Sequence, residues 1–434
     1  MPEGFLASFL GAVQACLSIL LVIFYGVLAT QFKLLDGPSA KKISKVCVRM
    51  FLPALLITKV GSELHADTGT RYIPILIWAL FYNLVSIGIG LLAVKFLKLP
   101  AWITPALAFN NTTSLPLLLI ESLQSTGILD KLVSKNDDAS SAISRAQSYF
   151  LVCAIVSNCL TFAVGPRLVD AENAPDKEED DKEDDGGEHQ DQEGHSHSDV
   201  EQGHDNNDEL TSLLPQRIHT GQDEAQKRAF HMGKKHWAKL SPRTQKVLLF
   251  AADFLNAPLI GAVIGAVIGL VPPLHRVFFN ESIDGGIFNA WITESLKKIG
   301  QLFVTLQVVV VGVSLSSSLR KMKRGEQKAL PWEPTVLILV VRLLLWPILS
   351  IGIIWGLSTK TNVLSQDPIL WFAMMIMPAG PPAMKLVAMA DVSGADENDK
   401  MTISKILTLS YAASPIMALT VVGALYASQD AMSR

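Results

Sequence analysis

The chain has 434 residues, of which 49% are hydrophobic and 18% are charged, and its mean hydropathy is +0.33. This balance is more apolar than that of an ordinary water-soluble domain and gives no support to nucleic-acid binding. The net charge of −3 hides an acidic segment inside a basic remainder, since the residues from Asp170 to Glu209 hold eighteen Asp and Glu against two Lys.

Long apolar stretches dominate the rest of the chain. The first lacks the basic flank of a cleaved signal peptide and is too long for its hydrophobic region, so it is predicted to be a membrane helix. A spanning helix needs about 20 mainly apolar residues. Ten stretches qualify and predict an all-α integral membrane protein with ten transmembrane helices: 5–29, 43–60, 73–96, 102–123, 148–169, 247–271, 299–319, 336–357, 369–390 and 403–427.

The ten predicted helices fall into two sets of five. Residues 1–169 and 247–434 would form two repeats, and an odd number of helices in each inverts the second relative to the first. Residues 170–246 form a loop between them. Lys and Arg are modestly more frequent in the loops that share a side with this segment, which predicts a cytosolic loop and termini outside or in the lumen.

The central loop combines low hydrophobicity with charge of one sign, which predicts disorder. Its basic end, before the sixth span, is expected on the anionic cytoplasmic headgroups. Glu209, Leu213 and Leu214 fit an acidic dileucine sorting signal for a cytosolic adaptor. A DDxxD metal pattern at Asp180 is nearly guaranteed in so acidic a block, so neither a metal nor a cofactor is predicted.

All four cysteines lie inside apolar stretches and are expected to be small buried hydrophobes rather than disulfide partners. They are Cys16, Cys47, Cys153 and Cys159.

The fourth span carries the strongest local signal for a site. Five consecutive polar residues run from Asn110 to Ser114, and Pro116 follows at membrane depth. Five polar side chains in a row cannot all face lipid, and the proline removes a backbone donor, so we expect the helix to be interrupted at Pro116. The interruption would leave backbone groups free to meet a solute.

The ninth span is interrupted in the same way by Pro378, Gly380, Pro381 and Pro382. Two spans broken by Gly and Pro at matching places in two halves are the best pointer in a sequence to a midplane substrate site. The competing interpretation is a pair of proline kinks packed against neighbouring helices.

Lys385 follows the ninth-span break and is a candidate functional cation. Its ammonium could pair with an anionic substrate, or it could extend to the cytosolic surface. Asp253, Arg49 and Arg342 are weaker candidates, because each is expected near enough to a helix end to be solvated. Three further polar residues are expected mainly to bond between helices: Asn83, Asn158 and Gln307.

Four segments together resemble the auxin efflux carrier family, and within it the PIN-LIKES (PILS) branch. They are FNNTTSLPLLLIESL in the fourth span, LNAPLIGAVIGAVIGL in the sixth, VVVVGVSLSSSL in the seventh and PAGPPAMKL in the ninth. With the layout of five helices, a loop and five helices, the resemblance covers nearly the whole chain outside the loop.

The resemblance implies an inverted-repeat transporter whose fourth and ninth helices cross at broken segments, and in which one bundle moves past a scaffold like an elevator. It implies auxin-type indole carboxylates as substrates, the endoplasmic reticulum membrane as the location, and a homodimer. The dileucine pattern supports vacuolar or endosomal traffic instead, and the plasma membrane is a further alternative.

The match to the family motifs is partial. The family's fourth-helix motif resembles G-N-T-G-N-L-P-L, and five residues here match it: Asn111, Thr112, Leu115, Pro116 and Leu117. Asn110, Thr113 and Ser114 replace its first Gly, second Gly and second Asn. In the ninth helix Gly380 to Met384 match, and Lys385 stands where the PILS branch usually has Asn.

These observations predict a secondary transporter of small organic anions, including auxin-like indole carboxylates, that works by alternating access at a midplane crossover. The predicted substrate-binding residues are Asn110, Asn111, Thr112, Ser114, Pro116, Gly380, Pro381, Pro382 and Lys385. The alternative is a non-transporting membrane regulator that presents its loop to partners. An enzyme is not expected, because the chain has no HExxH or GxSxG motif, and it has no GxxxxGK[ST] for ATP.

Overall fold

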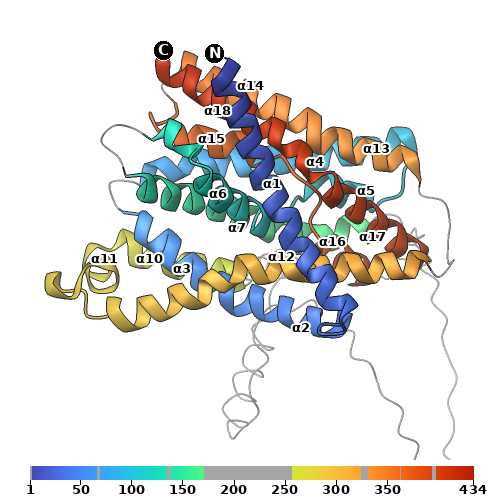
Figure 1. The fold of residues 1–434 in the computed structure, drawn as a ribbon, viewed down its shortest axis with the longest axis horizontal. Helices are drawn as coiled ribbons and strands as arrows, with labels where there is room; N and C mark the ends of the chain where they lie inside the picture. Colours follow the sequence, from blue (N-terminus) through green and yellow to red (C-terminus); the bar gives the residue numbers. More distant parts are fainter. Residues whose placement is uncertain are drawn as a thin grey trace, which may run out of the picture.

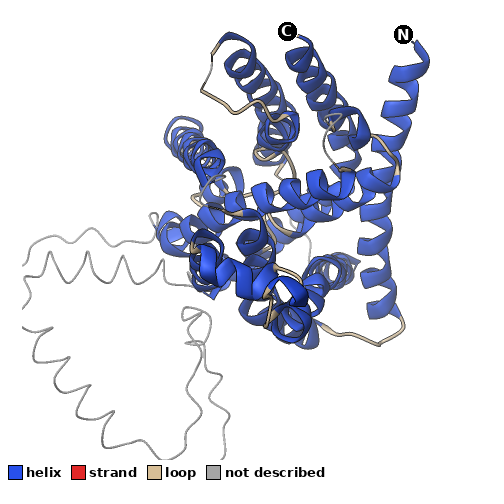
Figure 2. Ribbon diagram, turned by 90° about the vertical axis from the view of Figure 1, so that its left-hand side faces the viewer, coloured by secondary structure: helices blue, strands red, loops and turns tan. Residues whose placement is uncertain are grey.

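The structure, a computed structural model, describes residues 2–65, 69–133, 138–170, 257–323, 331–361, 363–392 and 397–434. Over these ranges every regular element is helical, and the one β feature is an isolated bridge between Asn110 and Pro382 (Figure 2). The predicted all-α class is therefore confirmed. The acidic block, the dileucine pattern and Asp253 lie outside the described residues.

Helices occupy the described part of each predicted stretch. In the first half they are α1 (Pro2–Gln31), α2 (Gly37–Val46), the π-helical turn η1 (Cys47–Phe51), α3 (Leu52–Glu63), α4 (Ile73–Leu97), α5 (Ile103–Ala108), α6 (Ser114–Ser125) and α7 (Ala139–Asp170). In the second half they are α10 (Ala257–Leu270), α11 (Pro272–Phe279), α12 (Glu294–Lys323), α13 (Trp332–Val340), the π-helical turn η7 (Val341–Leu345), α14 (Trp346–Lys360), α15 (Pro368–Ile376), α16 (Lys385–Val392), α17 (Glu397–Ala412) and α18 (Met417–Ser433).

The described part of the chain contains five helical stretches long and apolar enough to cross a membrane: Phe5–Gln31, Gly69–Leu97, Ala139–Gly165, Asn289–Ser317 and Trp332–Lys360. The number rises to seven if two bent helix pairs each form one span. The pairs are α10 with α11, bent by 103°, and α17 with α18, bent by 42°. The protein is thus an integral membrane protein.

The fourth and ninth predicted spans are each divided into two short helices. The fourth consists of α5 and α6, separated by residues 109–113, and the ninth consists of α15 and α16, separated by residues 377–384. The predicted position of the first break was wrong by several residues, because Pro116 lies in the first turn of α6. A proline is tolerated there, since the N–H groups of a first turn have no partner within the helix.

The helices form two groups (Figure 1). The lower group contains α2, α3, α10, α11 and α12, and within it α3 packs along both α10 and α12. The upper group contains α4 to α7 and α13 to α18, in which α15 packs against α7, α14 and α18. Helix α1 runs obliquely across both groups and contacts α12, α6 and α18.

Glycines bring backbones into close contact beside the lower group. A Cβ added to Gly26 of α1 would lie 2.1 Å from the Val309 carbonyl oxygen of α12, and one added to Gly312 would lie 2.0 Å from the Ile23 oxygen. In α10, a Cβ on Gly261 would lie 2.6 Å from the Cα of Pro53 in α3. Small residues allow such close helix packing in membranes.

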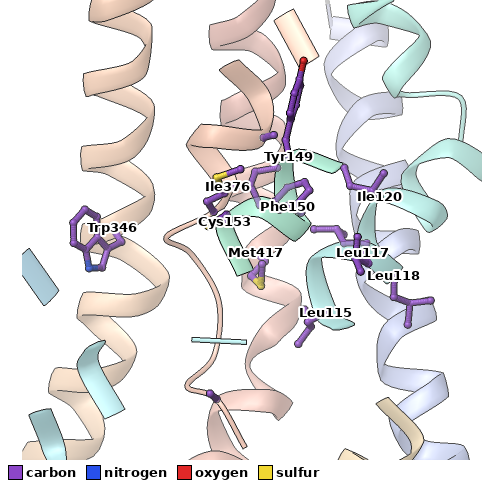
Figure 3. Packing of buried hydrophobic residues seen from close by; sticks show 14 of the residues in the cluster. Leu115, Leu117, Leu118, Ile120, Tyr149, Phe150, Cys153, Trp346, Ile376 and Met417 are labelled. Atoms are coloured by element: carbon purple, nitrogen blue, oxygen red, sulfur yellow. The ribbon is translucent and has the colours of Figure 1, made fainter. Parts of the chain in front are cut away.

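The centre of the upper group is a continuous apolar core. Figure 3 shows buried side chains from four helices around the broken spans: Leu115, Leu117, Leu118 and Ile120 of α6, Tyr149, Phe150 and Cys153 of α7, Ile376 of α15 and Met417 of α18. All four cysteines are buried, as predicted. This core surrounds the two helix breaks and fixes where they meet.

Candidate functional site

The two broken segments cross and pair through their backbones. Asn110 and Pro382 form an antiparallel bridge. The Asn111 N–H donates to the Pro381 carbonyl at 3.1 Å, and the Ala383 N–H donates to the Phe109 carbonyl at 2.9 Å. We call residues 109–114 and 377–385 together the crossover. Its short ladder satisfies backbone groups that the interrupted helices leave unpaired in the apolar core.

Asn110 attaches the fourth span to the end of α15. Its Nδ2 donates to the carbonyls of Met377 at 3.0 Å and Ala379 at 2.9 Å, and its side chain is buried. Its Oδ1 has no hydrogen-bond partner among the residues that the structure describes. Asn110 therefore caps the first residues after α15 and presents a buried acceptor at the crossover.

Asn111 is the centre of a small polar cluster. Its Nδ2 donates to Ser114 Oγ at 3.2 Å and to Tyr411 Oη at 3.0 Å, and Ser114 Oγ donates back to Asn111 Oδ1 at 3.3 Å. Ser114 and Tyr411 are buried, whereas Asn111 is half-buried. Tyr411, in α17, was not a predicted site residue, and its sequence context contains no signal for this role.

The ninth-span segment owes its shape to Gly380. This residue has φ +112°, a conformation that L side chains rarely adopt. Pro381 and Pro382 follow it in the crossover, and both are buried. Four predicted residues thus meet directly here through the bridge and the ladder: Asn110, Asn111, Pro381 and Pro382. Thr112, Thr113 and Pro116 are buried in the same segment as Asn110 and Asn111.

Lys385 is the first residue of α16 and is half-buried. Its ammonium donates to Asn158 Oδ1 of α7, and Asn158 is itself buried. The cation is therefore bonded inside the helix bundle next to the crossover. Asn158 makes an interhelical bond, as predicted, and so does Gln307, whose Nε2 lies 3.3 Å from Ser44 Oγ in α2. The Asn83 Nδ2 instead donates to Ala79 within α4.

The expectation that Arg342 is solvated near a helix end was wrong, because this side chain is 0% exposed. Helix α13 begins at Trp332, so ten residues at 1.5 Å each place Arg342 about 15 Å into the span. It lies in the π-helical turn η7, and its Nη1 donates to the Pro378 carbonyl of the crossover at 3.1 Å.

The crossover joins helix ends of opposite polarity. Helices α5 and α15 end there, whereas α6 and α16 begin there. Helix N-termini favour negative charge, and helix C-termini favour positive charge. The polar cluster at Asn111 and the ammonium of Lys385 lie at the two N-terminal ends. This arrangement suits a small solute with an anionic end and hydrogen-bonding groups.

The chain is similar to known membrane transport proteins. The sequence model of the family described as membrane transport protein matches residues 12–422. An uncharacterized transporter of Schizosaccharomyces pombe is 25% identical over 92% of this chain and 91% of its own. An uncharacterized transporter of Saccharomyces cerevisiae is 23% identical over 96% of this chain and 95% of its own.

Plant proteins match over shorter regions. Protein PIN-LIKES 2 of Arabidopsis thaliana is 30% identical over 32% of this chain and 28% of its own length. Since the family match covers nearly the whole chain and its relatives include PIN-LIKES proteins, the chain belongs to the membrane transport protein family of auxin efflux carriers.

Proposed function

We propose that this membrane transporter is a secondary carrier of small organic anions, auxin-like indole carboxylates among them, and that it works by alternating access at the crossover. The observation that carries the proposal is the reciprocal backbone pairing of two broken spans, Asn111 to Pro381 and Ala383 to Phe109. Such discontinuous helices form substrate sites near the bilayer midplane in secondary transporters.

The proposal includes ten membrane helices in two inverted repeats, residues 1–169 and 247–434, joined by a cytosolic loop. The breaks support it, because α5 and α6 occupy the fourth place in one half and α15 and α16 occupy the same place in the other. Two inverted halves would bring matching breaks to one depth from opposite sides. The endoplasmic reticulum location and the homodimer stay predictions.

We further propose that the upper group moves relative to the lower group. The side-chain bonds of the crossover described above go to residues of the upper group: Asn110 to the end of α15, Asn111 to Tyr411, Arg342 to Pro378 and Lys385 to Asn158. The lower group is held together by close backbone contacts between α3 and α10. A solute bound at the crossover would therefore travel with the upper group.

Substrate recognition would combine three kinds of donor. The N-termini of α6 and α16 supply partial positive charge, the Asn111 cluster supplies an amide and two hydroxyls, and Lys385 supplies an ammonium. A carboxylate attached to a flat apolar ring matches this set, because most of the surrounding core is apolar.

The test is solid-supported-membrane current from purified protein in liposomes, with indole acetate and a panel of small carboxylates. We expect a substrate-dependent current that falls strongly in Asn111→Ala and Lys385→Ala. Gln307→Ala is the control, because it removes a side-chain amide bonded to α2 outside the crossover.

Two outcomes would contradict the proposal. Absence of both current and radiolabelled anion uptake in the wild type, with and without a pH gradient, would favour the non-transporting regulator. Uptake that Asn111→Ala and Lys385→Ala leave intact would locate the site elsewhere.

A further inference from the structure

Among the residues that the structure describes, Arg342 makes one hydrogen bond, although its guanidinium carries five N–H donors. Only Nη1 is bonded, to the Pro378 carbonyl, and Nε and Nη2 have no hydrogen-bond partner among the residues that the structure describes. No carboxylate of these residues lies within ion-pair distance. A fully buried arginine with an unpaired charge is costly, so an arginine in this state inside a membrane protein indicates a function.

The two unpaired groups are not an arbitrary pair. Nε and Nη2 lie on the same edge of the planar guanidinium, and their N–H bonds point in nearly parallel directions. This edge forms the fork that binds both oxygens of a carboxylate at once. Since Nη1 is fixed on Pro378, the fork has a defined orientation beside the crossover.

The surroundings of the fork would strengthen such a contact. Trp346 lies four residues after Arg342, and its Nε1–H also has no partner within the described ranges. Tyr82 of α4 packs edge-on against Trp346, with ring centroids 5.9 Å apart. All three side chains are buried. Electrostatic contacts are stronger in such an environment than in water.

A purely structural role explains only part of this geometry. A cation near the C-terminus of α15 complements the negative end of that helix. That role requires a positive charge and the bond to Pro378, and a lysine could supply both. It provides no partner for Nε, Nη2 or the indole N–H of Trp346.

We propose that Arg342 is a specificity-determining residue that binds the carboxylate of the transported anion through Nε and Nη2. This inference rests on the proposed function and deepens it, because it adds Arg342 of η7 to the groups that recognise the anionic end of the solute. The ligand class is a monocarboxylate, and a neutral amide of the same shape should bind without using the fork.

The experiment measures binding of two matched ligands to detergent-solubilised full-length protein by isothermal titration calorimetry. The ligands are indole-3-acetate and its neutral counterpart indole-3-acetamide. The variants are Arg342→Gln, which removes the charge and the fork, and Arg342→Lys, which keeps the charge. Arg49→Gln makes the same change in another π-helical turn, η1. Size-exclusion chromatography checks that each variant is folded.

We expect Arg342→Gln to raise the Kd of the carboxylate by roughly tenfold or more, the loss of a bidentate charged pair, and to change the Kd of the amide by less than about threefold. Arg342→Lys should restore only part of the carboxylate affinity that Arg342→Gln loses. Arg49→Gln should change neither Kd. If Arg342→Gln does not fold, Arg342→Lys is the deciding variant. The ratio of the amide Kd to the carboxylate Kd must then fall by about threefold or more relative to the wild type.

The inference fails if the carboxylate keeps its affinity in the variants, or if both ligands lose affinity equally. In that case the proposed function still stands, since the wild type binds and carries the anion. A wild type that neither binds nor transports any carboxylate of the panel refutes the proposed function itself. The two failures are therefore distinguished by the wild type.

Discussion

Asn110 and Pro382 lie opposite each other in a single antiparallel bridge, although they are 272 positions apart in the chain. The bridge is the only β pairing among the described residues, and it lies inside an apolar helical core. Because unpaired backbone groups are costly in lipid, each broken span depends on the other for its hydrogen bonds.

Asn110→Ala should lower the stability of the protein by about 2 kcal/mol or more, because it leaves the buried carbonyls of Met377 and Ala379 without their side-chain donor. Thermal unfolding in detergent measures the effect. Asn83→Ala is a matched control, since Asn83 is also fully buried but donates only within its own helix. Equal losses in both variants would show that Asn110 does not join the two spans.

Tyr411→Phe should raise the KM for the transported anion about fivefold, because it removes a hydroxyl that accepts from Asn111 and leaves the ring in place. One hydrogen bond of about 1 kcal/mol corresponds to this factor. Uptake kinetics in liposomes measure the change. Tyr426→Phe, in α18, is the control, and an unchanged KM in Tyr411→Phe would remove Tyr411 from the site.

Gly312→Ala should destabilise the protein by more than about 2 kcal/mol, because the new Cβ would lie 2.0 Å from a backbone oxygen of α1 that cannot move independently of its helix. Gly352→Ala places the same methyl group where nothing lies within 4 Å. That control should be neutral or up to about 1 kcal/mol more stable. Melting curves of the two variants in one detergent compare them, and similar curves would contradict the close α1–α12 contact.

The Asp36 side chain lies in the loop between α1 and α2 and accepts a hydrogen bond from the Ser39 N–H at 2.8 Å. The hydrogen bond with the Ser39 side chain, followed by this backbone bond, lowers the pKa of Asp36 below its usual value. A lowered pKa stabilises the fold above the unfolded-state value of about 4, and the contribution is lost as the pH falls through the folded-state pKa.

The melting temperature should therefore fall less between pH 7 and pH 3 in Asp36→Asn than in the wild type. An asparagine caps a helix without titrating. Asp36→Ala should be less stable than either protein at pH 7. A wild type and an asparagine variant with the same pH dependence would show that the carboxylate contributes nothing.

The helices and the existence of both breaks could be predicted because their signals are local. Runs of about 20 apolar residues set the spans, and Pro381 and Pro382 after Gly380 cannot continue a helix. The exact position of the first break could not be predicted from Pro116, since proline fits a first helical turn as well as it ends a helix.

The roles of Tyr411 and Arg342 depend on contacts between segments far apart in the chain. Tyr411 meets Asn111 over a separation of 300 residues. Arg342 is buried because α13 begins earlier than its apolar run suggests, at Trp332. Neither fact is encoded in the neighbouring residues, whereas the polar run from Asn110 to Ser114 indicated that a break lies in this span.

The ladder at the crossover consists of main-chain bonds, Asn111 to Pro381 and Ala383 to Phe109. Any residue except proline can donate such a bond, and any residue can accept one. The ladder itself therefore does not depend on which side chains its residues carry. On the proposed function, a carrier built in this way can exchange Thr113, Ser114 or Lys385 for other residues during evolution and acquire a new cargo while the ladder stays in place.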